Sequence, residues 1–314
     1  MMKMKIEHFI FGSKGETPST PTLSIAVHLH LFYLNLVPEF AKALSNIPVP
    51  FALFVSVPEA IKTDEKDLEE SLHRISKLQR LEIRRTPNKG RDLAPMLCTF
   101  ADELQQYDLI LHLHSKKSPH EPLLKDWLPF ILFHLLPTSP RINDIFYELE
   151  HGTGMVAPPD FLYYTPTGWG SKKNMILAQQ LIDRSGLNIQ LKEEYPHILF
   201  PQGSMFWART EFLKELFALG LTYDDFPEEP IAPDGTIAHA MERLFFLWGS
   251  KSGLSAKNVY ESELDILQTQ RFIAMAIECS YFIKKNKKHL VICRILIALS
   301  VILLLALVYS LIAI

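Results

Sequence analysis

Cysteine is scarce in this chain of 314 residues, and the three thiols, Cys98, Cys279 and Cys293, are scattered without a C-x-x-C pair. A disulfide framework and a cysteine zinc site are therefore excluded, and a reducing compartment fits. An excess of positive charge is also lacking, because the formal net charge is −3. The composition therefore gives no indication of nucleic-acid binding. The sequence shows no internal repeat and no low-complexity segment.

A cleavable signal peptide is not expected, because residues 1–16 carry only a short apolar patch. One long apolar run does occur, at residues 295–314, and it carries no charge. As a helix it would span about 30 Å, roughly one hydrocarbon core, so we predict a transmembrane helix over 289–314. Basic residues precede it, and the positive-inside rule then places the bulk of the chain in the cytoplasm, anchored in the inner (cell) membrane by this single span. These residues are Lys284, Lys285, Lys287, Lys288 and Arg294.

The first third of the chain alternates between apolar runs and amphipathic segments. Strands are predicted over 23–33, 51–57 and 81–86, with helices over 37–46 and 58–78. This alternation is typical of a doubly wound α/β fold. We therefore expect an N-terminal extension (1–22), one Rossmann-like α/β domain (23–250) with a donor half (23–118) and an acceptor half (119–250), and a connecting helix with a basic juxtamembrane segment (251–288).

The stretch YDLILHLHSKKS, residues 107–118, is the centre of the functional argument. Its apolar part, 108–113, has no helical spacing and reads as a buried strand of a parallel sheet. Side chains two apart on a strand share a face, so His112, His114 and Lys116 point the same way at the carboxyl end, where α/β sheets bind ligands. With Lys117, they suit a diphosphate. Packing histidines and solvated lysines are the plain alternative, but four such groups together favour the site.

A second short motif, NKGRD, immediately precedes this strand. Asp92 is a plausible N-cap of the following helix, and free amides at a helix start beside Arg91 form an anion site. We assign Arg91 and Asp92 to diphosphate binding. Asn88 and Gly90 are assigned to the nucleotide and sugar pocket, together with a His-x-His pair in the first predicted strand, His28 and His30.

The acceptor half is read from aromatic and polar segments. Residues 160–173 form a loop rich in Tyr, Trp and Gly, residues 199–209 a turn and strand, and DGTIAHAMERLFFLW a helix over 234–248 capped by Asp234. Aromatic loops often form sugar platforms, although structural tyrosines are equally expected here. The residues assigned to acceptor binding are Trp169, Gly203, Ser204, Trp207, His239 and Glu242.

The order of these parts is similar to that of A-type glycosyltransferases, with one substitution. Such enzymes carry a D-x-D acid pair that holds a metal on the donor diphosphate, whereas this chain has no D-x-D motif and places histidines and lysines at the strand end. Cationic side chains can neutralise a departing diphosphate without a metal. The sequence therefore names no cofactor, and no metal ligand is assigned. Asp234 is the candidate base that deprotonates the acceptor hydroxyl, with a plain N-cap as its alternative.

Six motifs in order also resemble one family, the rhamnan synthesis protein F family of bacterial polysaccharide biosynthesis. They are VHLHLFY, LFVSV, NKGRD, LHLHSKKS, FPQGSMFWAR and DGTIAHAMERLF, and the resemblance covers residues 25–248. It implies L-rhamnosyl transfer from dTDP-L-rhamnose to a growing, lipid-linked cell-surface polysaccharide of rhamnan or O-antigen type. Family members are often parts of longer proteins.

Two other functions remain open from the residues. A metal-dependent hydrolase could use the two His-x-His strand ends, His28/His30 and His112/His114, as imidazole ligands, although Lys116 would crowd the cation. A non-catalytic glycan-binding scaffold of polysaccharide assembly would keep the fold without turnover, which fold analogy alone does not exclude.

Overall fold

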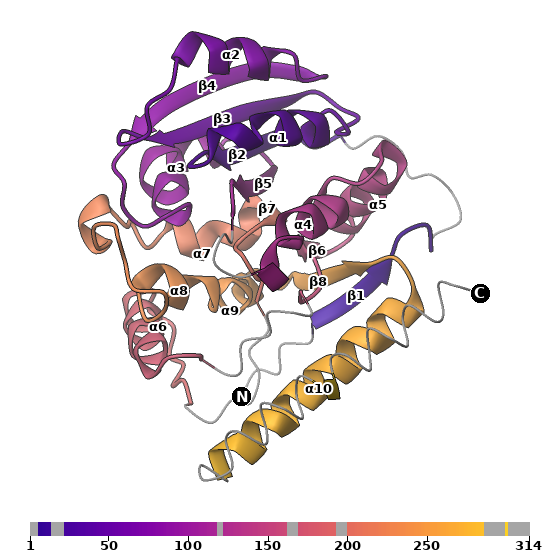
Figure 1. Cartoon of the computed structure of the whole chain (residues 1–314), viewed down its shortest axis with the longest axis vertical. Coiled ribbons are helices and arrows are strands. Elements are labelled where there is room, and N and C mark those ends of the chain that lie inside the picture. Colours follow the sequence, from indigo (N-terminus) through magenta and orange to yellow (C-terminus); the bar gives the residue numbers. More distant parts are fainter. Residues whose placement is uncertain are drawn as a thin grey trace.

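One eight-stranded sheet organises the chain in this computed structural model, which describes residues 6–13, 22–117, 122–161, 169–192, 200–285 and 299–300 (Figure 1). The strand order is β1-β8-β6-β7-β5-β2-β3-β4, and β7 alone runs antiparallel to its neighbours β5 and β6. The strands are β1 (Ile6–Ile10), β2 (Ile25–His30), β3 (Phe51–Pro58), β4 (Leu78–Thr86), β5 (Leu109–His114), β6 (Thr153–Ala157), β7 (Phe206–Arg209) and β8 (Ser255–Tyr260).

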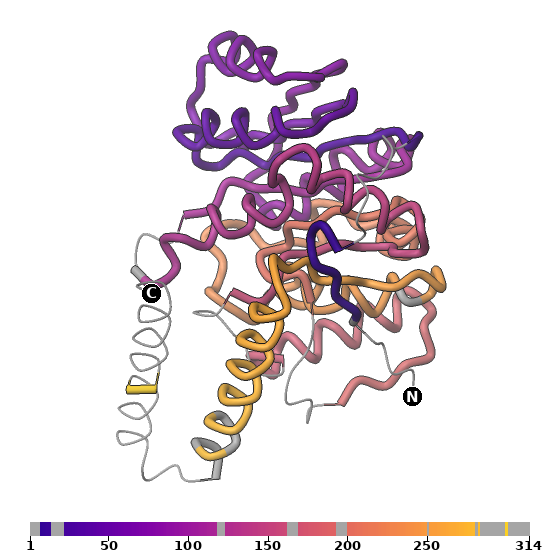
Figure 2. The backbone as a smooth tube through the Cα atoms, turned by 90° about the vertical axis from the view of Figure 1, so that its right-hand side faces the viewer, coloured from indigo at the N-terminus to yellow at the C-terminus, as the bar shows by residue number. Residues whose placement is uncertain are grey.

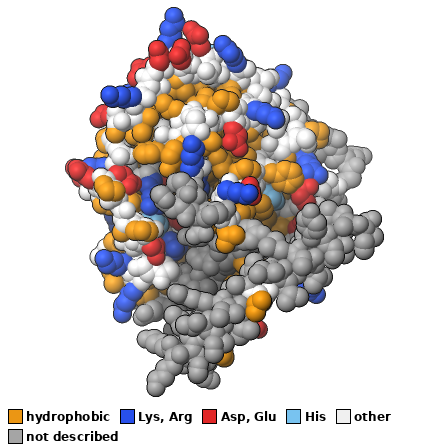
Figure 3. Space-filling model, viewed as in Figure 1, with side chains coloured by type: hydrophobic (Ala, Val, Ile, Leu, Met, Phe, Trp, Pro, Cys, Tyr) orange, Lys and Arg blue, Asp and Glu red, His pale blue; other side chains and the backbone are white. Residues whose placement is uncertain are grey.

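Helices cover both faces of the sheet, as expected of a mainly parallel one. One core cluster joins the strands to α1 (Val37–Leu44), α2 (Glu65–His73), α4 (Trp127–Leu135) and α5 (Ser139–Glu150). The other joins them to the π-helical turn η2 (Pro95–Thr99), α3 (Ala101–Leu104), α6 (Lys172–Arg184), α7 (Lys214–Phe217), α8 (Ile237–Glu242) and α9 (Phe245–Gly249). Charged side chains gather over the outer face of α2 at the top of Figure 3.

Three of the predicted strands, β2, β3 and β5, are confirmed. Every residue of β2 and β3 is buried, and so is β5 up to Leu113, in agreement with their mainly apolar sequences. The parallel register pairs His28 with His112 and His30 with His114. The two His-x-His motifs therefore lie side by side at the carboxyl ends of β2 and β5.

Several boundaries differ from the predictions. The predicted helix over 58–78 shrinks to α2, which Asp64 caps through the amides of Lys66 and Asp67. The helix over 234–248 is two short helices, α8 and α9, and the N-cap of α8 is Thr236 rather than Asp234.

The ends of the described chain also differ. The predicted N-terminal extension contains β1, and the predicted connection contains β8 before the helix α10 (Glu263–Lys285). Both strands belong to the central sheet, so the sheet crosses the predicted domain boundaries at 23 and 250. Figures 1 and 2 show α10 at the opposite end of the molecule from β4 and α2.

The predicted transmembrane segment, 289–314, lies outside the described residues except for 299–300. Within the ranges that the structure describes, no helix is both long and apolar enough to cross a bilayer.

Candidate functional site

A cavity of about 550 Å³ opens at the carboxyl ends of β2 and β5, where a ligand site is expected in a parallel sheet. We call it the strand-end cavity. Its walls combine the two strand ends, the NKGRD turn and one loop of the second half. The lining residues are His30, Phe32, Tyr33, Asn88, Arg91, Asp92, His114, Ser115, Lys116, Lys117, Glu229 and Pro230.

The cations of this cavity all have neutral partners. The Arg91 guanidinium contacts Nε2 of His239 at 3.2 Å, and Nζ of Lys117 donates to Oδ1 of Asn35 at 2.7 Å. Nζ of Lys116 lies 3.9 Å from the centre of the Trp127 ring. Within the described ranges, none of the three has a carboxylate at ion-pair distance. Three cations around one cavity without anionic partners leave its positive charge available to a ligand.

Lys116 is the most desolvated of the three. Burial lowers its pKa, against the opposing attraction of Glu242. Burial raises the pKa of Glu242 in turn, although Arg243 and Lys116 oppose the shift. An ammonium group taken from water without an ion-pair partner is costly, and a bound anion would restore the lost stabilisation.

His239 orients Arg91 from behind. Its Nδ1 bonds to Oγ1 of Thr236 at 2.7 Å, and burial together with the Arg91 charge lowers the pKa of His239 to about 4. The ring is therefore neutral near pH 7, its Nδ1–H donates to Thr236, and its Nε2 accepts from the guanidinium. The sequence placed His239 in the acceptor site, whereas the structure makes it the support of a diphosphate-binding candidate.

Five side chains form a hydrogen-bonded chain behind the cavity wall. Nδ1 of His28 and Nδ1 of His112 are 2.9 Å apart, with ring planes within 2°. His112 continues through Nε2 to Oδ2 of Asp92 at 3.1 Å. On the other side, Oγ of Ser56 lies 3.1 Å from Nε2 of His28 and 2.9 Å from Nδ1 of His30. His30 and Asp92, the two ends of this chain, both line the cavity.

Asp92 is held ionised by this arrangement. Burial opposes its charge, but the neighbouring His114 and His112 outweigh burial and hold the pKa of the carboxyl well below its usual range. The sequence assigned Asp92 as a helix cap. Asp92 does stand at the N-cap position, immediately before the first helical residue, Leu93, and its carbonyl accepts from the Met96 amide at 3.4 Å, but its carboxylate faces His112.

His114 and Glu242 meet at the turn before β7. Nε2 of His114 donates to the Gly203 carbonyl at 2.8 Å, and the Gly203 amide donates to Oε1 of Glu242 at 2.7 Å. Ser204 follows with φ +56°, its amide bonded to the Pro201 carbonyl. Gly203, Ser204 and Glu242 do not line the strand-end cavity, so the FPQGS turn supports the ring of His114 from outside the cavity.

The NKGRD turn is fixed to the loop of residues 226–231. The Glu229 amide donates to the Asn88 carbonyl at 3.4 Å, and Nζ of Lys89 lies 3.4 Å from Oε1 of Glu228. A Cβ on Gly90, which has φ +66°, would come within 2.5 Å of the Phe226 ring. Gly90 is thus a packing and turn residue, and it does not line the cavity as the sequence predicted.

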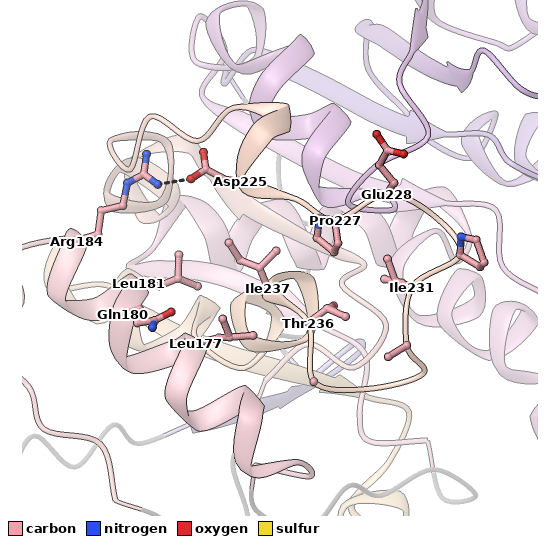
Figure 4. A pocket seen from close by; sticks show the side chains of 13 residues that line it. Leu177, Gln180, Leu181, Arg184, Asp225, Pro227, Glu228, Ile231, Thr236 and Ile237 are labelled. Carbon is pink, nitrogen blue, oxygen red and sulfur yellow. Dashed lines mark hydrogen bonds and ion pairs between the residues drawn. The ribbon is translucent and has the colours of Figure 1, made fainter.

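A second cavity, of about 640 Å³, lies on the other side of the same loop (Figure 4). We call it the loop cavity. Figure 4 shows Leu177 and Leu181 of α6 facing Ile231 across it, with the Arg184–Asp225 ion pair of 2.6 Å at one end. Pro230 lines both cavities, so one stretch of loop separates two adjacent binding spaces.

The remaining predicted residues lie away from both cavities. His28 and His112 are fully buried behind the cavity wall. Trp207, predicted to contact the acceptor, is a core residue with no exposed surface, and its Nε1 donates to the Leu135 carbonyl. The Nε1 of Trp169 donates to the Lys192 carbonyl, so this ring is a structural support of its loop.

Asp234 also lines neither cavity. Its Oδ1 accepts from Nδ2 of Asn174 at 2.7 Å and lies 3.9 Å from the Arg243 guanidinium. Burial acts to raise its pKa, but the bonds from Asn174 and the Gly235 amide, with Arg243, lower it overall. Such a carboxylate is a weak base in this conformation.

Sequence reasoning missed several residues of the site. Ser56 gave a signal, because it is the one polar side chain in the apolar strand FALFVSV. Ser115 accepts from the amides of Phe32 and Tyr33 at 2.7 and 2.8 Å and so fixes the cavity rim. Glu229 reaches the cavity only through the pairing of its loop with the NKGRD turn, a contact without a local pattern.

The structure also bears on the metal-site alternative. The part of the chain that is described contains no group of three or more His, Cys, Asp or Glu side chains placed to hold a metal ion. The four histidines do not converge on one point, since the facing nitrogens of His28 and His112 bond to each other. This geometry favours a hydrogen-bonded chain over a ligand set.

Comparison with known proteins adds a family and two relatives. The family model described as Rhamnan synthesis protein F matches residues 3–252. The chain is 29% identical over 256 residues to the "Uncharacterized protein WxcX" of two Xanthomonas campestris pv. campestris strains, B100 and ATCC 33913. Each alignment covers 78% of this chain and 34% of the relative. The chain thus spans about a third of the length of these curated relatives.

Proposed function

The chain belongs to the rhamnan synthesis protein F family, and from this premise we propose that it is a glycosyltransferase of polysaccharide biosynthesis. The donor we propose is dTDP-L-rhamnose. The acceptor is a growing lipid-linked glycan of rhamnan or O-antigen type, and the membrane attachment predicted for residues 289–314 would hold the protein beside it.

Removal of residues 289–314 should then move the protein from the membrane to the soluble fraction, and a truncated protein that stays with the membrane would contradict this attachment.

The observation that carries the proposal is the set of three cations with neutral partners around the strand-end cavity. Arg91, Lys116 and Lys117 contact an imidazole, an indole ring and an amide respectively. Donors of this charge and geometry bind the two phosphates of a nucleotide sugar, and they stabilise the charge that grows on the leaving diphosphate. The cavity volume of about 550 Å³ is in the range of small-molecule sites.

We assign the acceptor to the loop cavity. Its aliphatic walls and a few polar groups, among them Gln180 and Thr236, suit a deoxysugar with a methyl group and ring hydroxyls. Since Pro230 lines both cavities, the reacting hydroxyl of an acceptor bound there would extend past Pro230 into the strand-end cavity, where the donor binds. Most of the aromatic loop expected from the sequence to form a sugar platform, residues 162–168, lies outside the described residues, so that platform stays a prediction.

Calorimetric titration with dTDP-L-rhamnose at low salt, with and without chelator, tests the donor site. Lys116→Ala and Arg91→Ala should each weaken binding by about 10- to 100-fold, since a hydrogen bond to a charged group contributes about 1.5–3 kcal/mol. The control is Lys62→Ala, an exposed lysine outside the cavity, which should bind as the wild type. Unchanged affinity in both cavity variants would overturn the proposal. Donor binding without any transfer to a glycan acceptor would instead favour the scaffold function.

A further inference from the structure

The buried chain from Asp92 to His30 is not needed to bind a diphosphate. His28, Ser56 and His112 have no exposed surface, and the rings of Phe100 and Phe206 flank the two imidazoles at centroid distances of 5.7 and 5.6 Å. Five polar groups in an apolar setting carry a desolvation cost, which continuous hydrogen bonding offsets. Their two ends meet the same cavity, and this placement calls for a role beyond packing.

The direction of every hydrogen bond in the chain follows from the charge of Asp92 when the ring of His112 carries a single proton. A carboxylate only accepts, so Nε2–H of His112 must donate to it, and Nδ1 of a singly protonated ring is then bare. At 2.9 Å from that nitrogen, Nδ1 of His28 must carry the shared proton. The ring of His28 is neutral, because burial lowers its pKa well below the usual value.

The remaining links are then fixed as well. Nε2 of His28 has no proton, so the Ser56 hydroxyl donates to it over 3.1 Å. Having spent its one hydrogen, Oγ of Ser56 accepts from Nδ1–H of His30 over 2.9 Å. The neutral ring of His30 is left with an unprotonated Nε2, which has no hydrogen-bond partner in the described part of the chain. His30 lines the strand-end cavity, so this lone pair belongs to a cavity-lining ring.

We propose that His30 is the catalytic base, and that Ser56, His28, His112 and Asp92 form a proton relay that removes the charge from the cavity. The inference rests on the proposed function for its substrate. The acceptor hydroxyl oxygen forms a bond to the anomeric carbon of the donor sugar, and the bond from that carbon to the diphosphate breaks, with the electron pair leaving on the diphosphate. The hydroxyl proton passes to Nε2 of His30.

The relay then moves one proton at each link. Nδ1–H of His30 passes to Ser56, the Ser56 hydroxyl proton to Nε2 of His28, and Nδ1–H of His28 to Nδ1 of His112. The net result is an imidazolium at His112, 3.1 Å from the Asp92 carboxylate, and a reversed set of hydrogen bonds. No proton is created or lost, and reversal of the steps releases the proton after the product leaves.

The relay explains how a poorly basic histidine could serve as the base. Burial lowers the pKa of His30 to about 3, against the opposing attraction of Asp92, so an isolated imidazolium there would not persist at neutral pH. Transfer of the positive charge to His112 places that charge beside Asp92, the one carboxylate of the relay. His112, His28 and Ser56 are therefore positioning residues, and a merely structural network would need neither this direction nor the bare Nε2.

Nitrogen-15 NMR of the histidine side chains in the full-length protein tests the direction without any substrate. We expect His28 and His30 in the Nδ1–H form and His112 in the Nε2–H form at pH 7. Ser56→Ala should leave His112 unchanged and alter the signals of His28 and His30. A His30 ring protonated at Nε2 in the wild type would overturn the relay, whatever the substrate of the protein proves to be.

Steady-state transfer then separates a relay from a packing role. Ser56→Ala should lower kcat by at least about tenfold with an unchanged KM for the donor, and Ser56→Thr, which keeps the hydroxyl, should restore most of the loss. His30→Gln should lower kcat by about 10²- to 10⁴-fold. The melting temperature of each variant controls for folding. An unchanged kcat in Ser56→Ala would overturn the relay.

Asp234, the base predicted from the sequence, is the competing candidate. A loss of transfer in Asp234→Asn with full activity in His30→Gln would overturn the assignment of His30. Failure of the wild type to transfer rhamnose, with the expected tautomers observed, would reject the proposed donor but support the relay.

Discussion

Four histidines around the strand-end cavity are held neutral by their surroundings. Burial is the leading cause for His28, His30, His114 and His239, and nearby positive or imidazole groups add to it. Neutral rings can accept as well as donate hydrogen bonds, and both the Arg91 support and the relay depend on this property. Because these histidines are neutral in the folded protein, the free energy of unfolding depends on pH.

Stability should therefore fall as the pH is lowered from 7.5 to 4.5. In the unfolded chain each histidine takes up a proton near pH 6.5, whereas the folded-state pKa of His30 is about 3. The unfolded state binds more protons in this window, so each such histidine removes up to about 1.4 kcal/mol per pH unit. The pKa of the Asp92 carboxyl is also lowered, so its linkage has the same sign, but its contribution is lost only below about pH 4, near the pKa of an unfolded aspartate.

Urea unfolding at four pH values measures this slope. His30→Gln should reduce it by about 1.4 kcal/mol per pH unit, and His73→Gln is measured beside it as the control for removal of an exposed histidine. Equal slopes in the wild type and His30→Gln would contradict a neutral, buried His30.

For single residues, the sequence predicted which kinds of side chain lie at the site but not which groups they contact. The H-x-H spacing predicted that His112 and His114 share a face, and the structure confirms that both approach Asp92. The sequence could not show which groups the two rings contact. The contacts of His112 and His114 depend on the register of β5 with β2 and on the turn at Gly203, whose carbonyl accepts from His114.

Two elements far apart in the chain build the rim of the strand-end cavity. The NKGRD turn and the loop of residues 226–231 are joined by a short antiparallel bridge between Lys89 and Glu228. Gly90 makes this approach possible, because a Cβ there would lie 2.5 Å from both Ala94 and Phe226. The position of Arg91, itself at φ +55°, depends on the same turn.

Gly90→Ala should destabilise the protein by about 2–4 kcal/mol, as the sum of a left-handed backbone penalty and overpacking. It should also weaken donor binding, since Asn88 and Arg91 move with the turn. Gly186→Ala is the matched control: its φ is +69°, but a Cβ there meets no atom within 4 Å. It should cost about 1–2 kcal/mol and leave binding intact. Equal losses of stability in both variants would show that the contact with Phe226 carries no weight.

The elements predicted best were those with a strong local pattern. The apolar runs of β2, β3 and β5 and the amphipathic α1 were placed within a few residues. The prediction that Asp234 caps a helix was wrong, because the N-cap position of α8 is Thr236, two residues later. β1 and β8 were missed, because residues 6–10 and 255–260 alternate weakly and lie outside the matched motifs.

At the scale of the molecule, the sheet joins the beginning and the end of the described chain. β8 pairs with β6 on one side and with β1 on the other, so residues 6–10 form the outermost strand. Phe9 and Phe11 lie in the core that also contains α4 and α5. The Gly12 amide donates to Oδ2 of Asp144 at 2.9 Å. A segment expected to be an extension is thus part of the fold.

This placement predicts that the first residues are needed for stability. Phe9→Ala should cost about 3–5 kcal/mol, because its ring is 7% exposed and pairs in register with Val259. His8→Ala, on the exposed side of the same strand, should cost less than about 1 kcal/mol.

Deletion of residues 1–13 should lower the melting temperature and cause self-association, since an uncovered β8 would offer unpaired backbone groups to another chain. Thermal unfolding and size-exclusion chromatography measure both effects. A deletion variant that melts and elutes like the intact protein would contradict this prediction. It would show that residues 1–13 are an extension and that β8 serves as the edge strand of the sheet.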